Sequence, residues 1–405
     1  MFELRSRRRI VRSVVVSVAL LLVAAGCDIG WEGPSFEGAS GSPSGSKPES
    51  KLWYNDGTWW ADLWDVGTGD FYVHRLDLGS RQWVRTNTRL DTRANSRSDS
   101  LWDGTHLYVA SHAFAEGSSN TPTGVAELRR FSYDTNTDTY SLDSGFPVQI
   151  NNARSETLVI DRDGNDRIWA TWVQNKQVMV TVSDPGGVNF AAPTALPVSS
   201  TKVSTDDISA VLTFAGDKVG VLWSNQSDEK MYFTQRLQTP GSAWGPTEVA
   251  YSGKSAADDH INLKNVVDQG GRILAATKTS TSGSSNVLVT LLDRSPSGTW
   301  TSHPYGTGGD NHTRPIVLVD RQHQSVHMFA TSGQSGGAIY EKTAPLDAID
   351  FPSGKGRAVL VDEDEPDINN ATSTKQNVDA TTGLVVLATN DTTDRYWTHY
   401  DPLSN

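Results

Sequence analysis

Residues 208–250 read ISAVLTFAGDKVGVLWSNQSDEKMYFTQRLQTPGSAWGPTEVA. In this stretch short apolar and β-branched runs alternate with turn-forming residues, and apolar positions do not recur at the spacing of a helix. Such a pattern is typical of β-strands joined by tight turns. The pattern predicts four strands, at 208–214, 219–223, 231–236 and 244–250.

The same unit recurs along the chain with a period of about 53 residues. An aromatic residue follows a turn in each repeat, at Trp83, Tyr140, Phe190, Trp244, Trp300 and Phe351. Tight turns ahead of strongly apolar strands repeat with the same period, for example at Asp103-Gly104, Asp163-Gly164 and Gly270-Gly271. A repeat of about 50 residues with four short strands has the size of a propeller blade. We therefore predict an all-β chain folded as a seven-bladed β-propeller of four-stranded blades.

The last repeat shows three strands, the third at 396–400, so its fourth strand has to come from elsewhere. Trp31 lies about one period before Trp83, in a stretch that matches the fourth strand of the 208–250 repeat. One interpretation is that residues 29–37 close the ring by supplying that strand, which removes an open sheet edge. The alternative is a flexible tether, because residues 38–50 are rich in Ser, Gly and Pro.

The N-terminus has the features of an export signal. Five arginines in the first 13 residues precede an apolar run from Val14 to Ala25, which is too short to span a bilayer. The run ends in Leu22-Val23-Ala24-Ala25-Gly26-Cys27, which resembles the lipobox of bacterial lipoproteins, and Cys27 is the only cysteine. The basic segment at 6–12 is similar to a twin-arginine signal.

These features predict three segments. They are a signal peptide at 1–26, a lipid-anchored segment and linker at 27–50, and the propeller at 51–405. The resemblance implies lipidation at Cys27, export, and attachment to the membrane only through the lipid. The net charge of −12 disfavours nucleic acid as a partner, since an acidic surface repels phosphates.

Ionisable or amide side chains precede or begin the first strand of repeats 2 to 7, and their identity differs from one repeat to the next. In a propeller these positions ring one end of the central channel, where an asymmetric polar ligand would need varied partners. The predicted site residues are Arg97, Asp99, Arg154, Glu156, Asp206, Asp207, Asp258, Asp259, His260, Asn262, His312, Arg314, Asn370 and Lys375. The alternative is that these groups only cap loops and face water.

The residue types limit the chemistry. Asp207 and Asp259 are candidate acid and base groups. His260 and His312 could carry protons or bind a metal together with Asp258 or Asp259. Arg314 and Lys375 could hold a substrate carboxylate, with Arg97, Asp99, Arg154, Glu156, Asp206, Asn262 and Asn370 as further binding residues. Asp258 is a candidate ligand for a divalent cation such as Ca²⁺, and no other cofactor is predicted.

The chain resembles the sialidase-like propellers that carry Asp-box (BNR) repeats. The likeness covers roughly residues 51–405, and its motif is Ser295-Pro296-Ser297-Gly298-Thr299-Trp300, an Asp-box that lacks its aspartate. Sialidases hold the substrate carboxylate with three arginines. Arg97, Arg154 and Arg314 precede the first strand of three repeats, so the resemblance allows a similar cluster here. No Tyr–Glu nucleophile pair can be placed.

The resemblance implies a carbohydrate-active protein. We expect a surface-anchored propeller that binds an acidic carbohydrate or other small polar ligand in its channel. If it is an enzyme, it is a glycosidase or polysaccharide lyase. The alternative is a non-catalytic propeller that binds glycan or protein.

Overall fold

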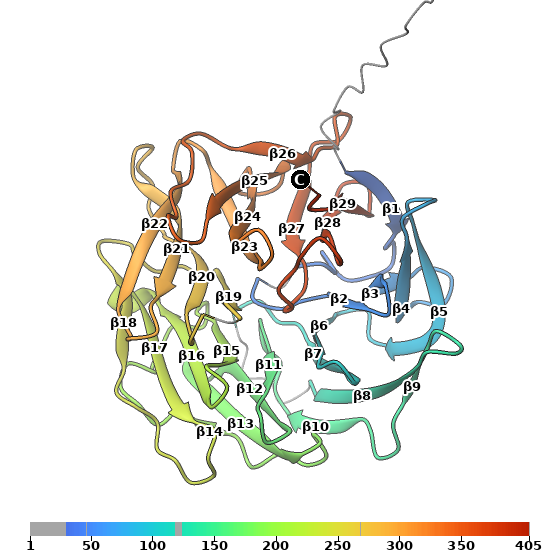
Figure 1. Ribbon diagram of the computed structural model, residues 1–405, viewed down its shortest axis with the longest axis horizontal. Helices are drawn as coiled ribbons and strands as arrows, with labels where there is room; N and C mark the ends of the chain where they lie inside the picture. The colour runs from blue at the N-terminus through green and yellow to red at the C-terminus, as the bar shows by residue number, and fades with distance from the viewer. Residues whose placement is uncertain (1–29, 46, 118–123, 268, 405) are drawn as a thin grey trace, which may run out of the picture.

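Seven β-sheets surround a central axis in the computed structural model of this chain, and Figure 1 views them down that axis. The structure describes residues 30–45, 47–117, 124–267 and 269–404. Within these residues the only helix is a single 3-10 turn, η1 (Gln226–Asp228). No helix in the described part of the chain is long and apolar enough to cross a membrane. The prediction of a seven-bladed β-propeller is confirmed.

Each blade is one antiparallel sheet whose strands follow one another from the axis outward. Blade 1 consists of β2 (Leu52–Asn55), β3 (Thr58–Asp65), β4 (Asp70–Asp77) and β5 (Gln82–Asp91). Blade 2 consists of β6 (Ser96–Trp102), β7 (His106–Ala113) and β8 (Ala126–Asp134), with two short outer strands, β9 (Thr139–Leu142) and β10 (Val148–Asn151). Blade 3 consists of β11 (Val159–Arg162), β12 (Arg167–Gln174), β13 (Gln177–Pro185) and β14 (Thr194–Ala195).

The remaining blades repeat this order. Blade 4 consists of β15 (Ser209–Phe214), β16 (Lys218–Asn225), β17 (Lys230–Leu237) and β18 (Glu248–Ser252). Blade 5 consists of β19 (Ile261–Asn265), β20 (Ile273–Lys278), β21 (Val287–Arg294) and β22 (Trp300–Thr307). Blade 6 consists of β23 (His312–Asp320), β24 (Ser325–Ser332), β25 (Ala338–Pro345) and β26 (Arg357–Leu360). Blade 7 contains β27 (Ile368–Thr372), β28 (Leu384–Asn390) and β29 (Arg395–Asp401).

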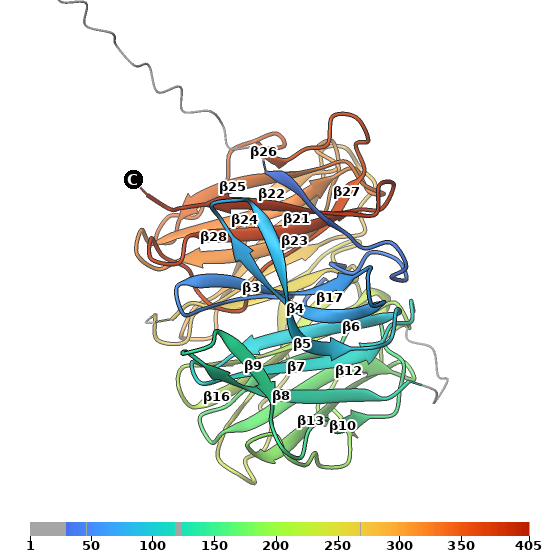
Figure 2. The ribbon, with the colours of Figure 1, turned by 90° about the vertical axis from the view of Figure 1, so that its right-hand side faces the viewer.

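The outer strand of blade 7 comes from the other end of the described chain. β1 (Trp31–Ser35) pairs antiparallel with β29, with Trp31 opposite Thr398 and Glu32 opposite Trp397. In Figures 1 and 2 the blue β1 lies beside the red strands of this blade. This is the position predicted for residues 29–37, so β1 covers an edge that blade 7 would otherwise expose.

Blades bury both faces of their sheets against their neighbours. Seven of the eight residues of β16 are buried, without the alternation of a half-exposed sheet. Aromatic rings fill the spaces between blades, as where Trp53 of blade 1 meets Tyr140 of blade 2 edge to face. Burial of such large rings is a main stabilising contribution.

The predicted strand bounds agree better with the observed inner strands than with the outermost strand of a blade. In blade 4 the first three predicted strands overlap β15, β16 and β17, but β18 begins at Glu248, so Trp244 precedes it. Trp244 instead packs edge to face on Trp169 of blade 3. The Asp-box-like segment forms the turn between β21 and β22, where the backbone N–H of Thr299 donates to Ser295 Oγ at 3.0 Å.

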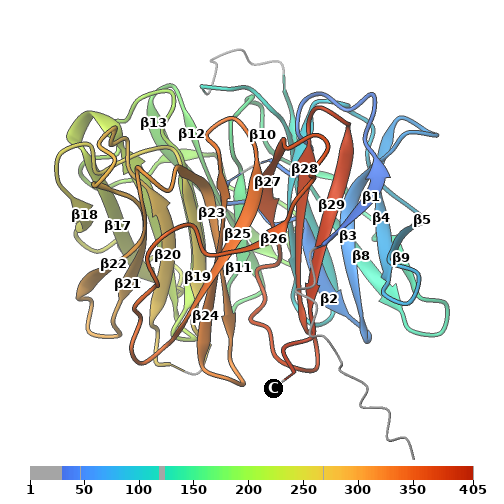
Figure 3. The same cartoon turned by 90° about the horizontal axis from the view of Figure 1, so that it is seen from above.

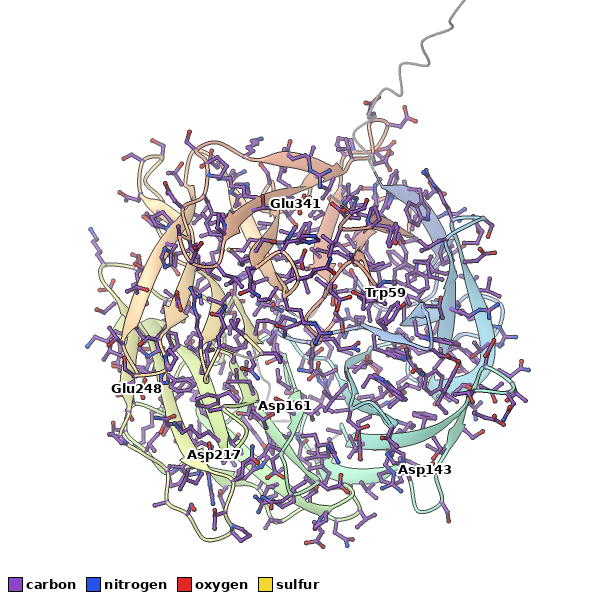
Figure 4. All side chains as sticks on the ribbon, in the orientation of Figure 1. Trp59, Asp143, Asp161, Asp217, Glu248 and Glu341 are labelled. Carbon is purple, nitrogen blue, oxygen red and sulfur yellow. The ribbon has the colours of Figure 1, made fainter. Side chains whose placement is uncertain are left out.

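The innermost strands are β2, β6, β11, β15, β19, β23 and β27, and they lie around the axis. Figure 3 shows β11, β19, β23 and β27 among them from the side of the disc. Figure 4 shows Asp161, on β11, near the middle of the disc, whereas Asp143 and Glu248 lie toward its rim. The pKa of Asp161 is raised because its carboxyl is buried. Ionisable side chains therefore lie inside the channel as well as at its ends.

Candidate functional site

Residues 36–51, which join β1 to β2, cross one end of the channel, and we call them the strap. Its backbone bonds to blade 7 through the N–H of Phe36 and Asp394 O (2.8 Å), and to the start of blade 2 through the N–H of Ser40 and Ala94 O (2.9 Å). The N–H of Ser50 donates to Asp99 in the channel wall at 2.8 Å. The segment that the sequence suggested as a tether or linker therefore packs against the propeller.

A pocket of about 270 Å³ opens between the strap and the ends of the blades. The strap contributes Gly41, Ser42, Gly45 and Lys47 to its wall, and blades 2, 3, 6 and 7 contribute Arg97, Phe114, Glu116, Glu156, Thr157, Arg314 and Asn370. Gly41 has a φ of +66°, and a Cβ there would lie 3.2 Å from Arg97 Nη2. The strap can approach the arginine closely because this position is glycine.

Arg97 is the most unusual side chain of the pocket. It is 5% exposed, and its Nη1 and Nη2 donate to the carbonyls of Ser96 and Ser40, both at 3.0 Å. Its Nε has no hydrogen-bond partner, and among the described residues no carboxylate forms an ion pair with it. Its guanidinium lies 5.0 Å from the centre of the Phe114 ring. Burial lowers the pKa of Arg97, yet an arginine remains charged.

Thr157 and Arg314 are two further polar groups of the wall that lack a partner, Thr157 a hydrogen bond and Arg314 an ion pair. Thr157 is 2% exposed, and its Oγ1 has no hydrogen-bond partner within the described chain. Arg314 donates from Nη1 to Gln334 O at 3.0 Å, and no described carboxylate forms an ion pair with it. Burial lowers the pKa of Arg314, and the charge of Asp259 opposes that shift. The pocket thus presents two guanidinium groups without ion pairs to whatever enters it.

An acidic cluster lies beside these arginines. Carboxylate oxygens of Glu156, Asp206 and Asp259 lie within 4.8 Å of one another. Lys47 Nζ contacts both Glu156, at 2.5 Å, and Asp259. His260 Nδ1 lies 2.7 Å from Asp259 Oδ1 and 2.6 Å from Asp258 Oδ1, and Asp258 also pairs with Lys278 at 2.9 Å.

The two carboxylates that hold Lys47 have opposite pKa shifts. Burial raises the pKa of Glu156 and Lys47 opposes the shift, while the charge of Asp259 adds to it. Burial would also raise the pKa of Asp259, but His260 and Lys47 hold it well below its usual range. Near neutral pH, Asp259 is therefore the more firmly ionised of the two.

Deeper in the channel the strap is fixed by buried charges. Glu49 Oε1 accepts from the backbone N–H of Leu158 at 2.7 Å and lies 2.7 Å from His112 Nε2. Lys51 pairs with Glu49 at 3.2 Å. All three ionisable side chains are almost completely buried. These bonds hold the strap, and with it Lys47, in one place.

The structure brings together most of the predicted site residues. Arg97, Glu156, Arg314 and Asn370 line the pocket, and Asp206, Asp258, Asp259 and His260 form the cluster beside it. Asn262 Nδ2 donates to Lys47 O at 3.4 Å and Asn262 Oδ1 accepts from the N–H of Val317 at 3.1 Å, so it supports the strap.

Other predicted residues lie elsewhere. Asp207 is fully buried and accepts from the N–H groups of Ser204 (2.7 Å) and Gln226 (3.1 Å), so it ties two loops together. His312 packs on Tyr305, with ring centres 5.0 Å apart, and burial lowers its pKa to about 4. Neither side chain lines the pocket or belongs to the acidic cluster, so Asp207 and His312 do not join Asp259 and Arg314 there.

Lys375 and Arg154 are also outside the pocket. Lys375 pairs with Asp99 at 2.9 Å deeper in the channel and lines a separate cavity with Asp161. Arg154 donates to Phe114 O at 2.9 Å and lines another pocket with Arg93 and Arg129. Of Arg97, Arg154 and Arg314, only Arg97 and Arg314 line the pocket.

Known proteins resemble this chain in structure rather than in sequence. No protein-family model and no curated protein sequence matches it. Its fold is shared with an ulvan lyase. That enzyme, of polysaccharide lyase family PL25, superposes with a TM-score of 0.57 and 11% identity, over 92% of this chain and 96% of the other.

The same lyase bound to -[GlcA(1-4)Rha3S]- superposes with a TM-score of 0.56, 11% identity and the same coverage. At this identity the likeness establishes the propeller fold and leaves the activity open.

Lys47, Phe114 and Glu116 are pocket residues that sequence reasoning missed. Lys47 lies in the Ser, Gly and Pro-rich stretch, yet Lys47, Glu49 and Lys51 precede the first strand of blade 1. The other site residues were predicted because they precede or begin the first strand of repeats 2 to 7. The same criterion applied to blade 1 would have included Lys47, Glu49 and Lys51. Trp59, Trp60, Trp64, Trp172 and Trp223 carry rings of the kind that can stack on sugars, but all five are buried. Cys27 lies outside the described residues.

Proposed function

We propose that this protein binds an acidic carbohydrate in the pocket between the strap and blades 2, 3, 6 and 7. The observation that carries the proposal is Arg97, a buried guanidinium with an unpartnered Nε and no carboxylate partner among the described residues. Leaving a buried donor unsatisfied and a buried charge uncompensated costs stability. A ligand carboxylate or sulfate would supply the missing partner.

The rest of the pocket wall suits a sugar. Thr157 offers a free hydroxyl oxygen, Ser42 and Asn370 add polar groups, and Phe114 offers an apolar surface. The net charge of −12 would repel a polyanion elsewhere on the surface, so the two arginines would act locally. The ulvan lyase of the same fold has been seen with a glucuronate-containing ligand, which supports this class of ligand for the present chain.

Calorimetric titration with oligosaccharides that contain glucuronate, against neutral oligosaccharides of equal length, tests the proposal. We expect binding of the acidic series only. Arg97→Ala and Arg314→Ala should each weaken it by about tenfold or more, because hydrogen bonds to charged groups contribute about 1.5–3 kcal/mol. Arg89→Ala, which removes an exposed arginine of blade 1, is the matched control. Equal affinity of Arg97→Ala and the wild type would refute the assignment.

We further propose that the pocket cleaves the bound carbohydrate, by hydrolysis or β-elimination, with Glu156 and Asp259 as the reacting carboxylates. Their opposite pKa shifts favour this, because an acid and a base need different protonation states at one pH. Reducing-end release detects either reaction, and ultraviolet absorbance of an unsaturated product identifies elimination. If Glu156 reacts, Glu156→Gln should keep binding and lose turnover. Binding without turnover by the wild type would assign a non-catalytic binding role.

We propose that the propeller is exported and held at the membrane through lipidated Cys27. The apolar run that ends at this single cysteine supports the proposal. A cell-surface position would give the pocket access to polymeric carbohydrate.

A further inference from the structure

The acidic cluster beside the pocket combines carboxylates from three different blades. Glu156 precedes β11, Asp206 precedes β15 and Asp259 precedes β19, and their oxygens lie within 4.8 Å of one another. Burial raises the pKa of Glu156 and of Asp206, and in both cases the charge of Asp259 adds to the shift. Carboxylates this close repel one another unless one of them is protonated or a cation lies between them.

Hard divalent cations are bound by oxygen clusters of this kind, and the sequence suggested Ca²⁺. The geometry does not fit a metal ion, because Lys47 Nζ already contacts two of the three carboxylates. Among the neighbouring groups, Asp258 and Asp259 share His260, and Asp258 also holds Lys278. The cluster is therefore occupied by side-chain cations of the chain itself.

Lys47 is held in this position by its backbone. It has a φ of +54°, which is uncommon for a residue with a side chain, and its carbonyl accepts from Asn262 Nδ2. Its side chain is 15% exposed. Burial alone would lower the pKa of Lys47, but Glu156 and Asp259 raise it above its ordinary value, so the ammonium stays charged.

The same side chain also faces the ligand pocket. Lys47 lines the wall together with Arg97 and Arg314, while Glu156 lines it from the acidic cluster. Without the ammonium, an anionic ligand held by the two arginines would approach uncompensated carboxylates. Lys47 thus lies between the cluster and the site that we assign to the carbohydrate.

We propose that Lys47 is a specificity-determining residue whose fixed charge takes the place of a divalent cation, so that this pocket binds acidic carbohydrate without metal. The inference rests on the proposed function for its ligand. It predicts that the acidic cluster becomes a cation site once the lysine is removed.

The test compares the wild type with Lys47→Met, which keeps the aliphatic stem and removes the charge. Ca²⁺ is titrated into each metal-free protein, without carbohydrate, by calorimetry. We expect Ca²⁺ to bind Lys47→Met and not the wild type, and the double variant Lys47→Met with Asp259→Asn to lose the gained site. Lys254→Met, at an exposed lysine, controls for net charge.

Glucuronate oligosaccharides are then titrated with chelator and with Ca²⁺. The wild type should bind equally in both, whereas Lys47→Met should lose about tenfold in affinity with chelator and regain most of it with Ca²⁺. Chelator-sensitive binding by the wild type, or undiminished binding by Lys47→Met, would overturn the inference.

The two arms separate this inference from the proposed function. If the wild type binds no acidic carbohydrate, the proposed function fails, and the Ca²⁺ titration of Lys47→Met still decides whether the lysine replaces a cation. A folded Lys47→Met that binds no Ca²⁺ refutes the replacement. If Lys47→Met melts below the assay temperature, the melting temperatures of both proteins are compared with and without Ca²⁺. A rise with Ca²⁺ in Lys47→Met alone supports the inference, and no rise refutes it.

Discussion

Whether an arginine has a carboxylate beside it determines what that residue does in this protein. Arg294 is as buried as Arg97, but its Nε and Nη2 donate to Glu248, both at 2.8 Å, so the pair satisfies itself. Arg97 donates hydrogen bonds only to backbone carbonyls, and its Nε has no hydrogen-bond partner. Sequence alone could place Arg97, Glu156 and Arg314 near the channel, because each comes just before or at the start of an innermost strand.

The same reasoning could not separate Asp207 and His312 from these residues. Successive side chains of a strand point to opposite sides, so an error of one position reverses the direction of a side chain. Arg314 lines the pocket, whereas His312, two positions earlier, packs between Tyr305 and Tyr340. A bulge between Thr313 and Ile316 interrupts the alternation here, and the sequence pattern does not reveal it.

Buried histidines should make the protein sensitive to acid. Burial lowers the pKa of His74 and of His312 to about 4, so the unfolded chain binds these protons first, and stability is lost as the pH falls from about 6.5 to about 4. Each histidine can account for as much as about 3 kcal/mol. Asp62, whose pKa burial raises to about 6, opposes the trend in part.

Urea denaturation across this pH range measures the effect. His312→Phe should lessen the acid-induced loss of stability and leave carbohydrate binding unchanged, because His312 does not line the pocket. Loss of binding in a stably folded His312→Phe would restore the role that the sequence suggested.

At the level of elements, β1 and the strap differ in how far the sequence predicts them, although both pack against the propeller. β1 could be predicted because Trp31 keeps the period of the repeat, whereas the strap has no period and reads as a linker. Only tertiary contacts, such as those of Glu49 with His112 and Leu158, give the strap its fixed path. Composition alone does not anticipate such buried charges.

Deleting residues 30–37 should destabilise the propeller. The deletion removes the strand paired with β29 and takes Phe36 from its edge-to-face contact with Tyr396. We expect the melting temperature to fall by at least about 5 °C, because the exposed strand edge and the loss of apolar burial both lower the free energy of unfolding. A chain that begins at Gly30 is the control and should melt like the full chain. Equal melting of all three would mean that β1 adds nothing to the ring.

For the whole molecule, the proposed anchoring can be tested apart from the pocket. Cys27→Ala should release the protein from the membrane fraction after export, because two or more acyl chains are needed for stable attachment and Cys27 is the only cysteine that can carry them. Fractionation of cells followed by immunoblotting measures the distribution. The released variant should keep the carbohydrate affinity of the wild type. Retention of Cys27→Ala in the membrane would exclude lipid anchoring at this residue.

The pairing of β1 with β29 also sets the order in which the protein can be assembled. The first described strand finds its partner only after the last strand has been made, and such distant pairings form slowly. The strap joins β1 to β2, so its N-terminal end, where the N–H of Phe36 bonds to Asp394 O, is fixed on blade 7 only when the circle is joined. A newly made chain with six finished blades would have the arginines and the acids, but it would lack Asn370 of blade 7 and the contacts of the strap with that blade. Full carbohydrate binding would then require a completely synthesised chain. The bound ligand would stabilise the closed ring relative to the open one.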